Sequence, residues 1–141
     1  MPLDGIAWGV PWTDLDRAWP CVETLIERAT ATSRGKETAF DIRRALGSRD
    51  AQLWCFKANA DAPISAVAVT EIVNYPRRRV LRIRICTGED RERWQAGLLA
   101  LEDWARGQGC AGCEFIARPG WGRVLKAHGY ETTHHVVEKD L

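Results

Sequence analysis

The sequence has 141 residues, of which 45% are hydrophobic and 28% charged, and its 20 Lys and Arg residues nearly balance its 19 Asp and Glu residues. A formal net charge of +1 gives no overall field that would favour nucleic acid, an anionic membrane or an acidic substrate. The length fits one ordinary domain, and no apolar stretch approaches the roughly 20 residues that span a bilayer. We therefore expect a single cytoplasmic domain over residues 1–141.

The five cysteines are scattered through apolar segments, and their odd number favours reduced core thiols over a disulfide framework. Two of them form a CxxC pair, and three histidines could add nitrogen ligands to a zinc site. No second CxxC or His pair occurs at a finger-like spacing, so we expect no metal. These residues are Cys21, Cys55, Cys86, Cys110, Cys113, His128, His134 and His135.

The N-terminal third of the chain predicts an arm and two helices. Residues 1–13 combine Pro and Gly with tryptophan, which indicates an irregular arm with a short strand around Ile6–Trp8. Asp14 can cap a helix that runs to about Ala29, because apolar residues recur there at intervals of three and four. After a polar loop, Glu37–Leu46 has the pattern of a short helix.

The middle of the chain changes from a helical to a strand period. Gln52–Ala58, Ile64–Val73 and Val80–Cys86 are rich in β-branched and aromatic residues. Turn-forming residues separate them at 59–63 and 74–77. Because these connections are short, we expect the three strands to form an antiparallel meander.

The last third alternates helix and strand. Helical spacing covers Arg91–Arg106 and Pro119–His128, and strands are expected at Glu114–Ala117 and around His134–Val137. A strand, a helix and a strand over residues 80–117 fit a right-handed crossover between parallel strands. The predicted fold class is therefore α/β (α+β), with a mixed, mostly antiparallel sheet and one parallel strand-helix-strand crossover.

This order of elements, with LLALEDWARGQGC at 98–110 and RPGWGRVLKAHGY at 118–130, resembles the GNAT acyltransferase superfamily. The second segment is also similar to small, diverged GNAT-like proteins carried in tailed-phage genomes. The resemblance covers residues 14–141 as an architecture and 88–130 as sequence.

The resemblance implies that acetyl-CoA lies between two splayed strands, with its pyrophosphate on backbone N–H groups at the start of the crossover helix. Where the family has glycines in an Arg/Gln-x-x-Gly-x-Gly/Ala pattern, this chain has Asp90, Glu92 and Trp94. A shifted alignment brings other glycines and two arginines to the phosphates, while a well-capped helix start is the alternative. The candidate cofactor-binding residues are Cys86, Thr87, Gly88, Arg91, Arg93 and Gly97.

The catalytic groups that the resemblance implies are only partly present. The family tyrosine that protonates the departing thiolate aligns with Leu125, which leaves the role vacant unless Tyr130 or Tyr75 fills it. Glu71 on a predicted strand is a candidate general base for an amine. A cross-strand ion pair between Glu71 and Arg82 is the alternative.

Five arginines form a basic strip along the turn at residues 77–79 and the strand that follows. The strip could bind phosphate or an acidic protein surface, but the near-neutral charge and the lack of a nucleic-acid motif favour a solvated edge. In a regular strand, Arg82 and Arg84 would face away from three apolar neighbours. The residues concerned are Arg77, Arg78, Arg79, Arg82 and Arg84, with Leu81, Ile83 and Ile85 opposite.

Two hypotheses about function follow. The first is an N-acyltransferase that moves acetyl from acetyl-CoA to a small-molecule or protein amine. The second is a non-catalytic GNAT-fold phage protein, a pseudoenzyme that acts as a virion component or a host-directed binding module. The oligomeric state, the substrate and the host remain open at this stage.

Overall fold

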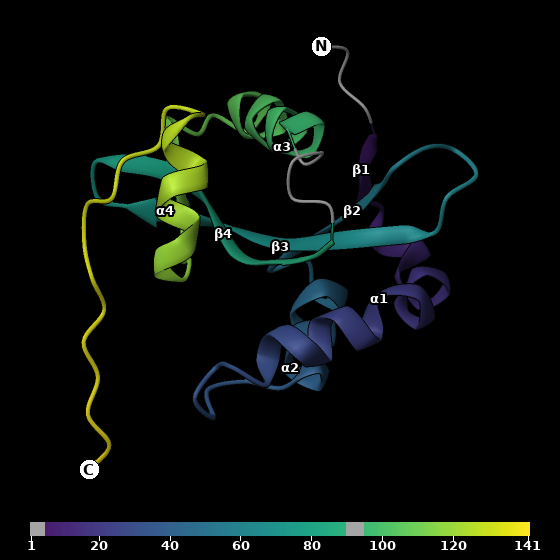
Figure 1. Ribbon diagram of the computed structural model, residues 1–141, viewed down its shortest axis with the longest axis horizontal. Coiled ribbons are helices and arrows are strands. Elements are labelled where there is room, and N and C mark those ends of the chain that lie inside the picture. The colour runs from purple at the N-terminus through teal and green to yellow at the C-terminus, as the bar shows by residue number, and fades with distance from the viewer. Residues whose placement is uncertain (1–4, 90–94) are drawn as a thin grey trace.

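The computed structural model describes residues 5–89 and 95–141 of the chain (Figure 1). Its elements are β1 (Ile6–Val10), a 3₁₀ turn (Trp12–Asp14), α1 (Leu15–Thr30), α2 (Ala39–Gly47), β2 (Gln52–Lys57), β3 (Ile64–Tyr75), β4 (Arg78–Gly88), α3 (Gln95–Gly107), β5 (Gly112–Phe115) and α4 (Pro119–Lys126). Within the described residues the strands form one sheet in the order β1-β2-β3-β4-β5. All neighbours are antiparallel except β4 and β5, which α3 connects in parallel. The predicted fold class is confirmed.

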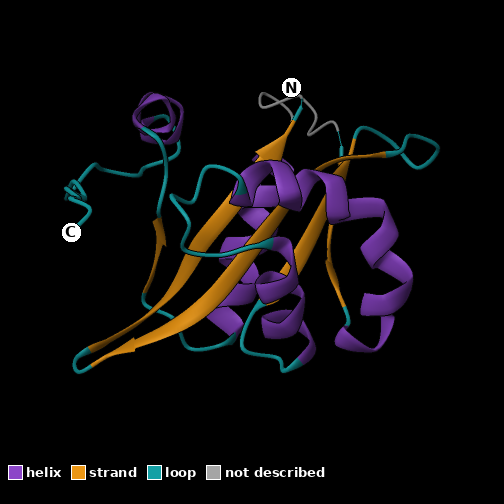
Figure 2. Cartoon of the chain, turned by 90° about the horizontal axis from the view of Figure 1, so that it is seen from below, coloured by secondary structure: helices purple, strands orange, loops and turns teal. Residues whose placement is uncertain are grey.

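The sheet separates two layers of helices (Figures 1 and 2). Helices α1 and α2 cover one face, and α3 covers the other, with Trp121 of α4 packed beside it. Alternate residues of each strand supply the two cores, since successive side chains point to opposite faces. The α1–α2 core includes Trp19, Val22, Ile26, Ile42, Val67 and Val69, and the α3 core includes Trp54, Phe56, Ala68, Leu81, Ile83 and Leu101.

The two N-terminal helices begin in different ways. Thr38 precedes α2 and forms a capping box, in which its N–H donates to the Asp41 carboxylate at 2.9 Å. Asp14 occupies the position before α1, as predicted, but its side chain makes no capping bond and pairs with Arg17 at 2.5 Å instead. Pro20 lies inside α1 without splitting the helix.

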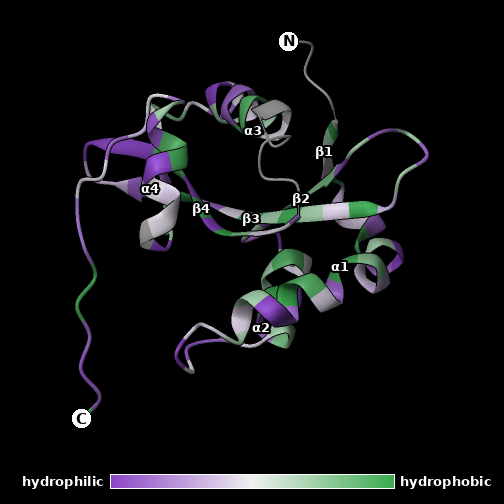
Figure 3. Cartoon of the chain, viewed as in Figure 1, coloured by the Kyte–Doolittle hydropathy of each residue, from purple (hydrophilic) through white to green (hydrophobic). Residues whose placement is uncertain are grey.

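The short strand predicted around Ile6–Trp8 is present as β1, which runs on to Val10 and pairs antiparallel with β2 at the edge of the sheet. The C-terminal end differs from the prediction. The strand predicted around His134–Val137 is absent, and residues 130–141 are extended without sheet pairing. The prediction was wrong because β-branched residues favour a strand only where a neighbouring strand is aligned with them. Val136 and Val137 form a short hydrophobic stretch in an otherwise polar tail and are 76% and 91% exposed (Figure 3).

The C-terminal tail crosses from the α4 side of the sheet to the α1–α2 side (Figure 1). There Glu138 pairs with Arg34 at 2.9 Å and with Lys36, both in the loop between α1 and α2. Asp140 adds a longer contact to Arg34 at 3.5 Å. Such exposed pairs are weak and screened by salt.

The tail contact predicts a pH dependence. Lys36 and then Arg34 hold the pKa of Glu138 below its ordinary value through hydrogen bonds and charge. A lowered folded pKa means that the contact is fully present above the ordinary carboxyl pKa and is lost as the pH falls through the lowered value. NMR titration of the Glu138 carboxyl should show this low midpoint, and Lys36→Met should move it back toward the ordinary value. An unchanged midpoint in that variant would contradict the contact.

No helix in the part of the chain that the structure describes is long and apolar enough to cross a membrane.

Candidate functional site

Strand β4 extends beyond the strand that pairs with it. The parallel ladder between β4 and β5 covers Val80–Ile83 on β4 and ends where Ile83 meets Phe115. One further bond follows, from the Ile116 N–H to the Ile83 carbonyl at 3.2 Å. Strand β4 continues to Gly88, so its last five residues have no β5 partner in the described chain. The sheet therefore opens along one side of β4.

A bulge at Arg84 changes which groups face this opening. On β3, Val69 is paired with Ile85 and Thr70 with Ile83, so Arg84 is the extra residue. A regular strand would have placed Ile85 with Leu81 and Ile83, as predicted. That prediction was wrong, because the bulge moves Ile85 into the α1–α2 core while the other two stay in the α3 core.

The bulge also determines which backbone N–H groups of β4 point toward the opening. Beyond the strand end, the Glu89 N–H donates to the Ser65 carbonyl on the β3 side at 2.9 Å. Since successive residues of a strand direct their backbone groups to opposite sides, Thr87 also faces β3, whereas Cys86 and Gly88 face the opening. Of the three β4 residues predicted as cofactor donors, two therefore direct their N–H groups to the open side.

Two of the glycines predicted to bind the cofactor lie at positions where a side chain would collide with its surroundings. Gly88 has φ = 138°, and a Cβ there would lie 2.3 Å from the Ser65 carbonyl oxygen. A Cβ on Gly97 of α3 would lie 2.1 Å from the Phe56 ring. Gly88 thus permits the backbone geometry at the end of β4, and Gly97 permits α3 to pack closely on the sheet. The other two predicted ligands, Arg91 and Arg93, lie outside the described residues, as do Asp90, Glu92 and Trp94.

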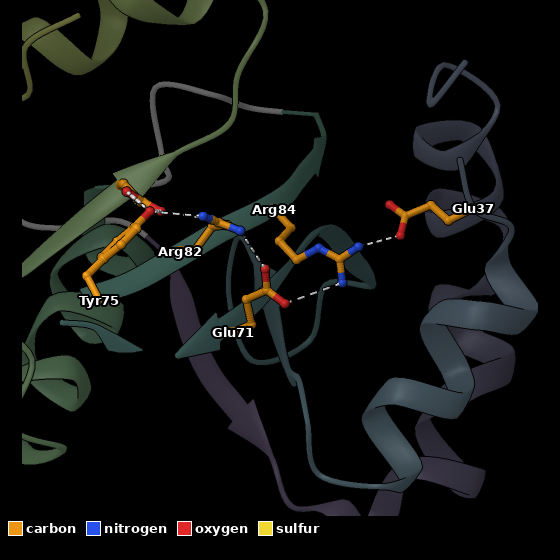
Figure 4. A network of polar contacts seen from close by, with 6 residues as sticks. Glu37, Glu71, Tyr75, Arg82 and Arg84 are labelled. Carbon is orange, nitrogen blue, oxygen red and sulfur yellow. Dashed lines mark hydrogen bonds and ion pairs between the residues drawn. The ribbon is translucent and has the colours of Figure 1, made fainter. Parts of the chain in front are cut away.

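A polar network lies on the α1–α2 face of β3, β4 and β5 (Figure 4). Arg82 donates to Glu71 at 3.2 Å and to Glu114 at 2.8 Å. The Tyr75 hydroxyl accepts from Arg82 at 3.0 Å and donates to Glu114 at 2.9 Å. The hydrogen bond with Glu114 is the main reason that the pKa of Arg82 is raised. The structure therefore contains the cross-strand ion pair that was the alternative for Glu71.

The network continues through Arg84 to the start of α2. Arg84 pairs with Glu37 and also lies 3.7 Å from the second oxygen of Glu71. Its side chain is only 25% exposed, and that of Glu37 is 20% exposed. Arg82 and Arg84 are thus neutralised within the sheet, whereas Arg77, Arg78 and Arg79 are exposed at the turn between β3 and β4 and at the start of β4. Glu37 was not among the predicted site residues, because no local pattern relates it to Arg84, 47 residues further along the chain.

The two tyrosines that could replace the missing acid are both engaged. Tyr130 donates to Glu102 at 2.8 Å and packs edge-on against Phe115, with ring centroids 5.3 Å apart. Burial, followed by the hydrogen bond to Glu102, raises the pKa of Tyr130. Tyr75 belongs to the Arg82 network, and Leu125, at the family tyrosine position, is only 6% exposed. Proton donation by either tyrosine requires that it first leave its partner.

The cysteines are all free thiols in different surroundings. Burial raises the pKa of Cys55 to about 12 and also raises those of Cys86 and Cys113. Cys21 is exposed on α1, unlike the core position predicted for it. Among the described residues, no group of three or more His, Cys, Asp or Glu side chains could hold a metal ion.

These surroundings predict selective thiol labelling. Because the thiolate is the reactive form, an aromatic disulfide reagent at pH 8 should modify Cys21 rapidly and Cys55 only on unfolding. Mass spectrometry of the labelled protein would identify the sites, and Cys21→Ser should remove the fast phase. Rapid labelling of Cys55 in the native protein would contradict the buried position.

The comparisons with known proteins bear on the fold of the chain. No protein-family model and no curated protein matches the chain. Among solved structures, the aminoglycoside N-acetyltransferase AAC(6')-Iy in complex with CoA aligns with 97% of this chain and 94% of its own, with a TM-score of 0.71 and 17% identity. A GNAT family acetyltransferase from Staphylococcus aureus aligns over 98% and 99% of the two chains, with a TM-score of 0.65 and 12% identity. A structure from Clostridium acetobutylicum, described as a predicted acetyltransferase with acetyl-CoA, aligns over 96% of each chain, with a TM-score of 0.62 and 18% identity.

These likenesses cover nearly the whole chain at low identity, so they establish the fold. The chain has the GNAT fold of acetyltransferases, as its sequence resemblance predicted. The relationship to phage proteins stays a prediction.

Proposed function

We propose that this protein is an N-acetyltransferase that transfers an acetyl group from acetyl-CoA to an amine. The observation that carries the proposal is the open side of β4, where pairing with β5 ends at Ile83 and the bulge at Arg84 turns backbone groups outward. Structures of the same fold contain CoA or acetyl-CoA, which supports a cofactor of this class.

The chain's own groups fit a thioester at this position. The N–H groups of Cys86 and Gly88 are fixed donors, and such preorganised donors stabilise negative charge that develops on a carbonyl oxygen. When bound, acetyl-CoA supplies an acetyl group activated as a thioester. We assign the pyrophosphate to the start of α3, where helix N–H groups favour phosphate, with Arg91 and Arg93 as candidate cations.

Glu71 is our candidate for the group that accepts the proton of the attacking amine. It lies on the same sheet face as Arg84, next to the bulge, and is 26% exposed, so a substrate amine could reach it. Its two guanidinium partners fit a structural ion pair equally well.

The test of Glu71 as the base is Glu71→Gln, which keeps the shape of the side chain. A loss of acetyl transfer of about 100-fold with unchanged acetyl-CoA affinity and unfolding midpoint would support the base. Unchanged activity would exclude it.

Calorimetric titration with acetyl-CoA is the direct test of the proposed function. We expect saturable binding in the micromolar range and acetylation of an added amine, detected as a mass increase in the amine. Binding should also raise the unfolding temperature, because a ligand that binds only the native state stabilises it. No binding at millimolar acetyl-CoA would contradict the proposal.

A non-catalytic phage protein, whether virion component or host-directed module, is the second candidate function. Leu125 favours it, because a buried leucine occupies the position of the family's proton donor. An absence of acetyl-CoA binding, together with recovery of the protein in purified phage particles, would support this candidate over the first.

A further inference from the structure

A groove of about 470 Å³ lies between α1 and the start of α2. Its walls combine aromatic rings with carboxylates, and the residues that matter are Trp19, Glu23, Glu27, Glu37, Phe40 and Arg43. Trp19 is nearly buried, whereas the Phe40 ring is 67% exposed. The groove thus offers both apolar surface and charge to a molecule from solution.

The charge of the groove differs from that of the chain. Three glutamates and one arginine, Arg43, line the groove. Glu37 pairs with Arg84, and Arg43 pairs with Asp16 at 3.0 Å. Among the described residues, neither Glu23 nor Glu27 forms an ion pair. They lie four residues apart on the same face of α1, so their like charges repel each other. The chain as a whole has a net charge of +1, so this negative groove is a local feature.

The aromatic walls already accept cations from the chain itself. The Arg43 guanidinium lies 5.4 Å from the centroid of Trp19, and that of Arg44 lies 6.0 Å from the centroid of Phe40. A cation within about 6 Å of a ring centroid is attracted by the ring. Methylene groups between two cationic centres would also pack on the exposed face of Phe40.

Glu37 connects the groove to the open side of β4. Glu37 is one of the residues that line the groove, and its carboxylate pairs with Arg84, the bulged residue of β4. Figure 4 shows this pair bridging the helix layer and the strand. A molecule held by Glu23 and Glu27 therefore extends toward the candidate acetyl-transfer site when it also reaches Glu37.

We propose that the groove binds a linear aliphatic polyamine, with one ammonium group held by Glu23 and Glu27 and the next amine directed past Glu37 toward β4. This inference rests on the proposed function in taking the polyamine as the acetyl acceptor. The charge complementarity of the groove selects the class of ligand. A monoamine with its one amine directed toward β4 leaves the carboxylates on α1 without a cation.

The test is calorimetric titration with spermidine, in the absence of acetyl-CoA, at low and at physiological salt. The double variant Glu23→Gln with Glu27→Gln should bind spermidine about tenfold more weakly than the wild type, because both carboxylates are lost. The matched control is Asp103→Asn with Glu131→Gln, two exposed carboxylates away from the groove, which changes the net charge equally. The control should bind spermidine as the wild type does, and both variants should keep their unfolding midpoint.

Three results would overturn the proposal: no spermidine binding by the wild type at millimolar concentration, equal binding by the groove variant, or equal weakening in the control. The last result would show attraction by net charge alone. Failure of the groove proposal can be distinguished from failure of the proposed function. If spermidine binds through Glu23 and Glu27 but acetyl-CoA does not bind, the groove proposal is supported and the proposed enzymatic function is contradicted. If a monoamine is acetylated and the groove variant retains full spermidine affinity, the proposed enzymatic function is supported and the groove proposal is contradicted.

Discussion

Gly88→Ala should destabilise the fold by about 2–4 kcal/mol, because it combines backbone strain with a collision. The new Cβ would lie 2.3 Å from the Ser65 carbonyl oxygen and 2.4 Å from the Ala66 Cα, and backbone atoms cannot move aside as a side-chain tip can. Urea unfolding followed by circular dichroism would measure the change. Because Gly88 ends the open segment of β4, the variant should also lose acetyl-CoA binding under conditions where it remains folded.

Gly109→Ala is the matched control for this variant. Gly109 also has a positive φ, 78°, but nothing lies within 4 Å of a Cβ built there. It should therefore show only the backbone cost, about 1 kcal/mol. Equal destabilisation by the two variants would show that a collision with Ser65 adds nothing to the cost of Gly88→Ala.

Gly97→Ala should cost about 1–3 kcal/mol, although alanine is the better helix former. Its Cβ would lie 2.1 Å from the ring of Phe56, a core residue that is only 6% exposed. Helix α3 would have to shift away from the sheet. Since α3 begins at the position that we propose for the pyrophosphate, acetyl-CoA affinity should fall as well.

Two further variants test this explanation. Gly107→Ala, at the end of α3 with nothing within 4 Å, should leave the free energy of unfolding unchanged or slightly higher. In a double-mutant cycle, Phe56→Leu should reduce the cost of Gly97→Ala, because the two residues share one contact. Additive effects of the two substitutions would contradict a collision between them.

Local patterns predicted most of the secondary structure. Strands β2, β3 and β4 follow from β-branched residues and turn signals, and α3 follows from helical spacing within LLALEDWARG. The pairing of Glu71 with Arg82 was anticipated as an alternative, since register follows from the short turn between their strands. The site could be predicted only as far as it depends on such neighbours along the chain.

The remaining features depend on contacts between distant residues. The sequence RIRIC has regular alternation and no signal for the bulge at Arg84, which is seen only in the register between β3 and β4. The groove likewise needs α1 and α2 to pack with Glu37 against Arg84. The tail shows the converse, because Val136 and Val137 have strand propensity but no aligned partner in this fold.

Local sequence patterns were therefore enough to predict the order of helices and strands as far as α4, the mixed sheet and the parallel crossover, because periodicity and turn chemistry act over a few residues. Local patterns do not predict where the β4–β5 ladder stops, which β4 backbone groups face the opening or which arginines are neutralised. These depend on the packing of segments up to about a hundred residues apart, as in the contact between Arg34 and Glu138. The fold could be inferred from local patterns in the sequence, whereas the candidate site is formed by residues that meet only in the folded chain.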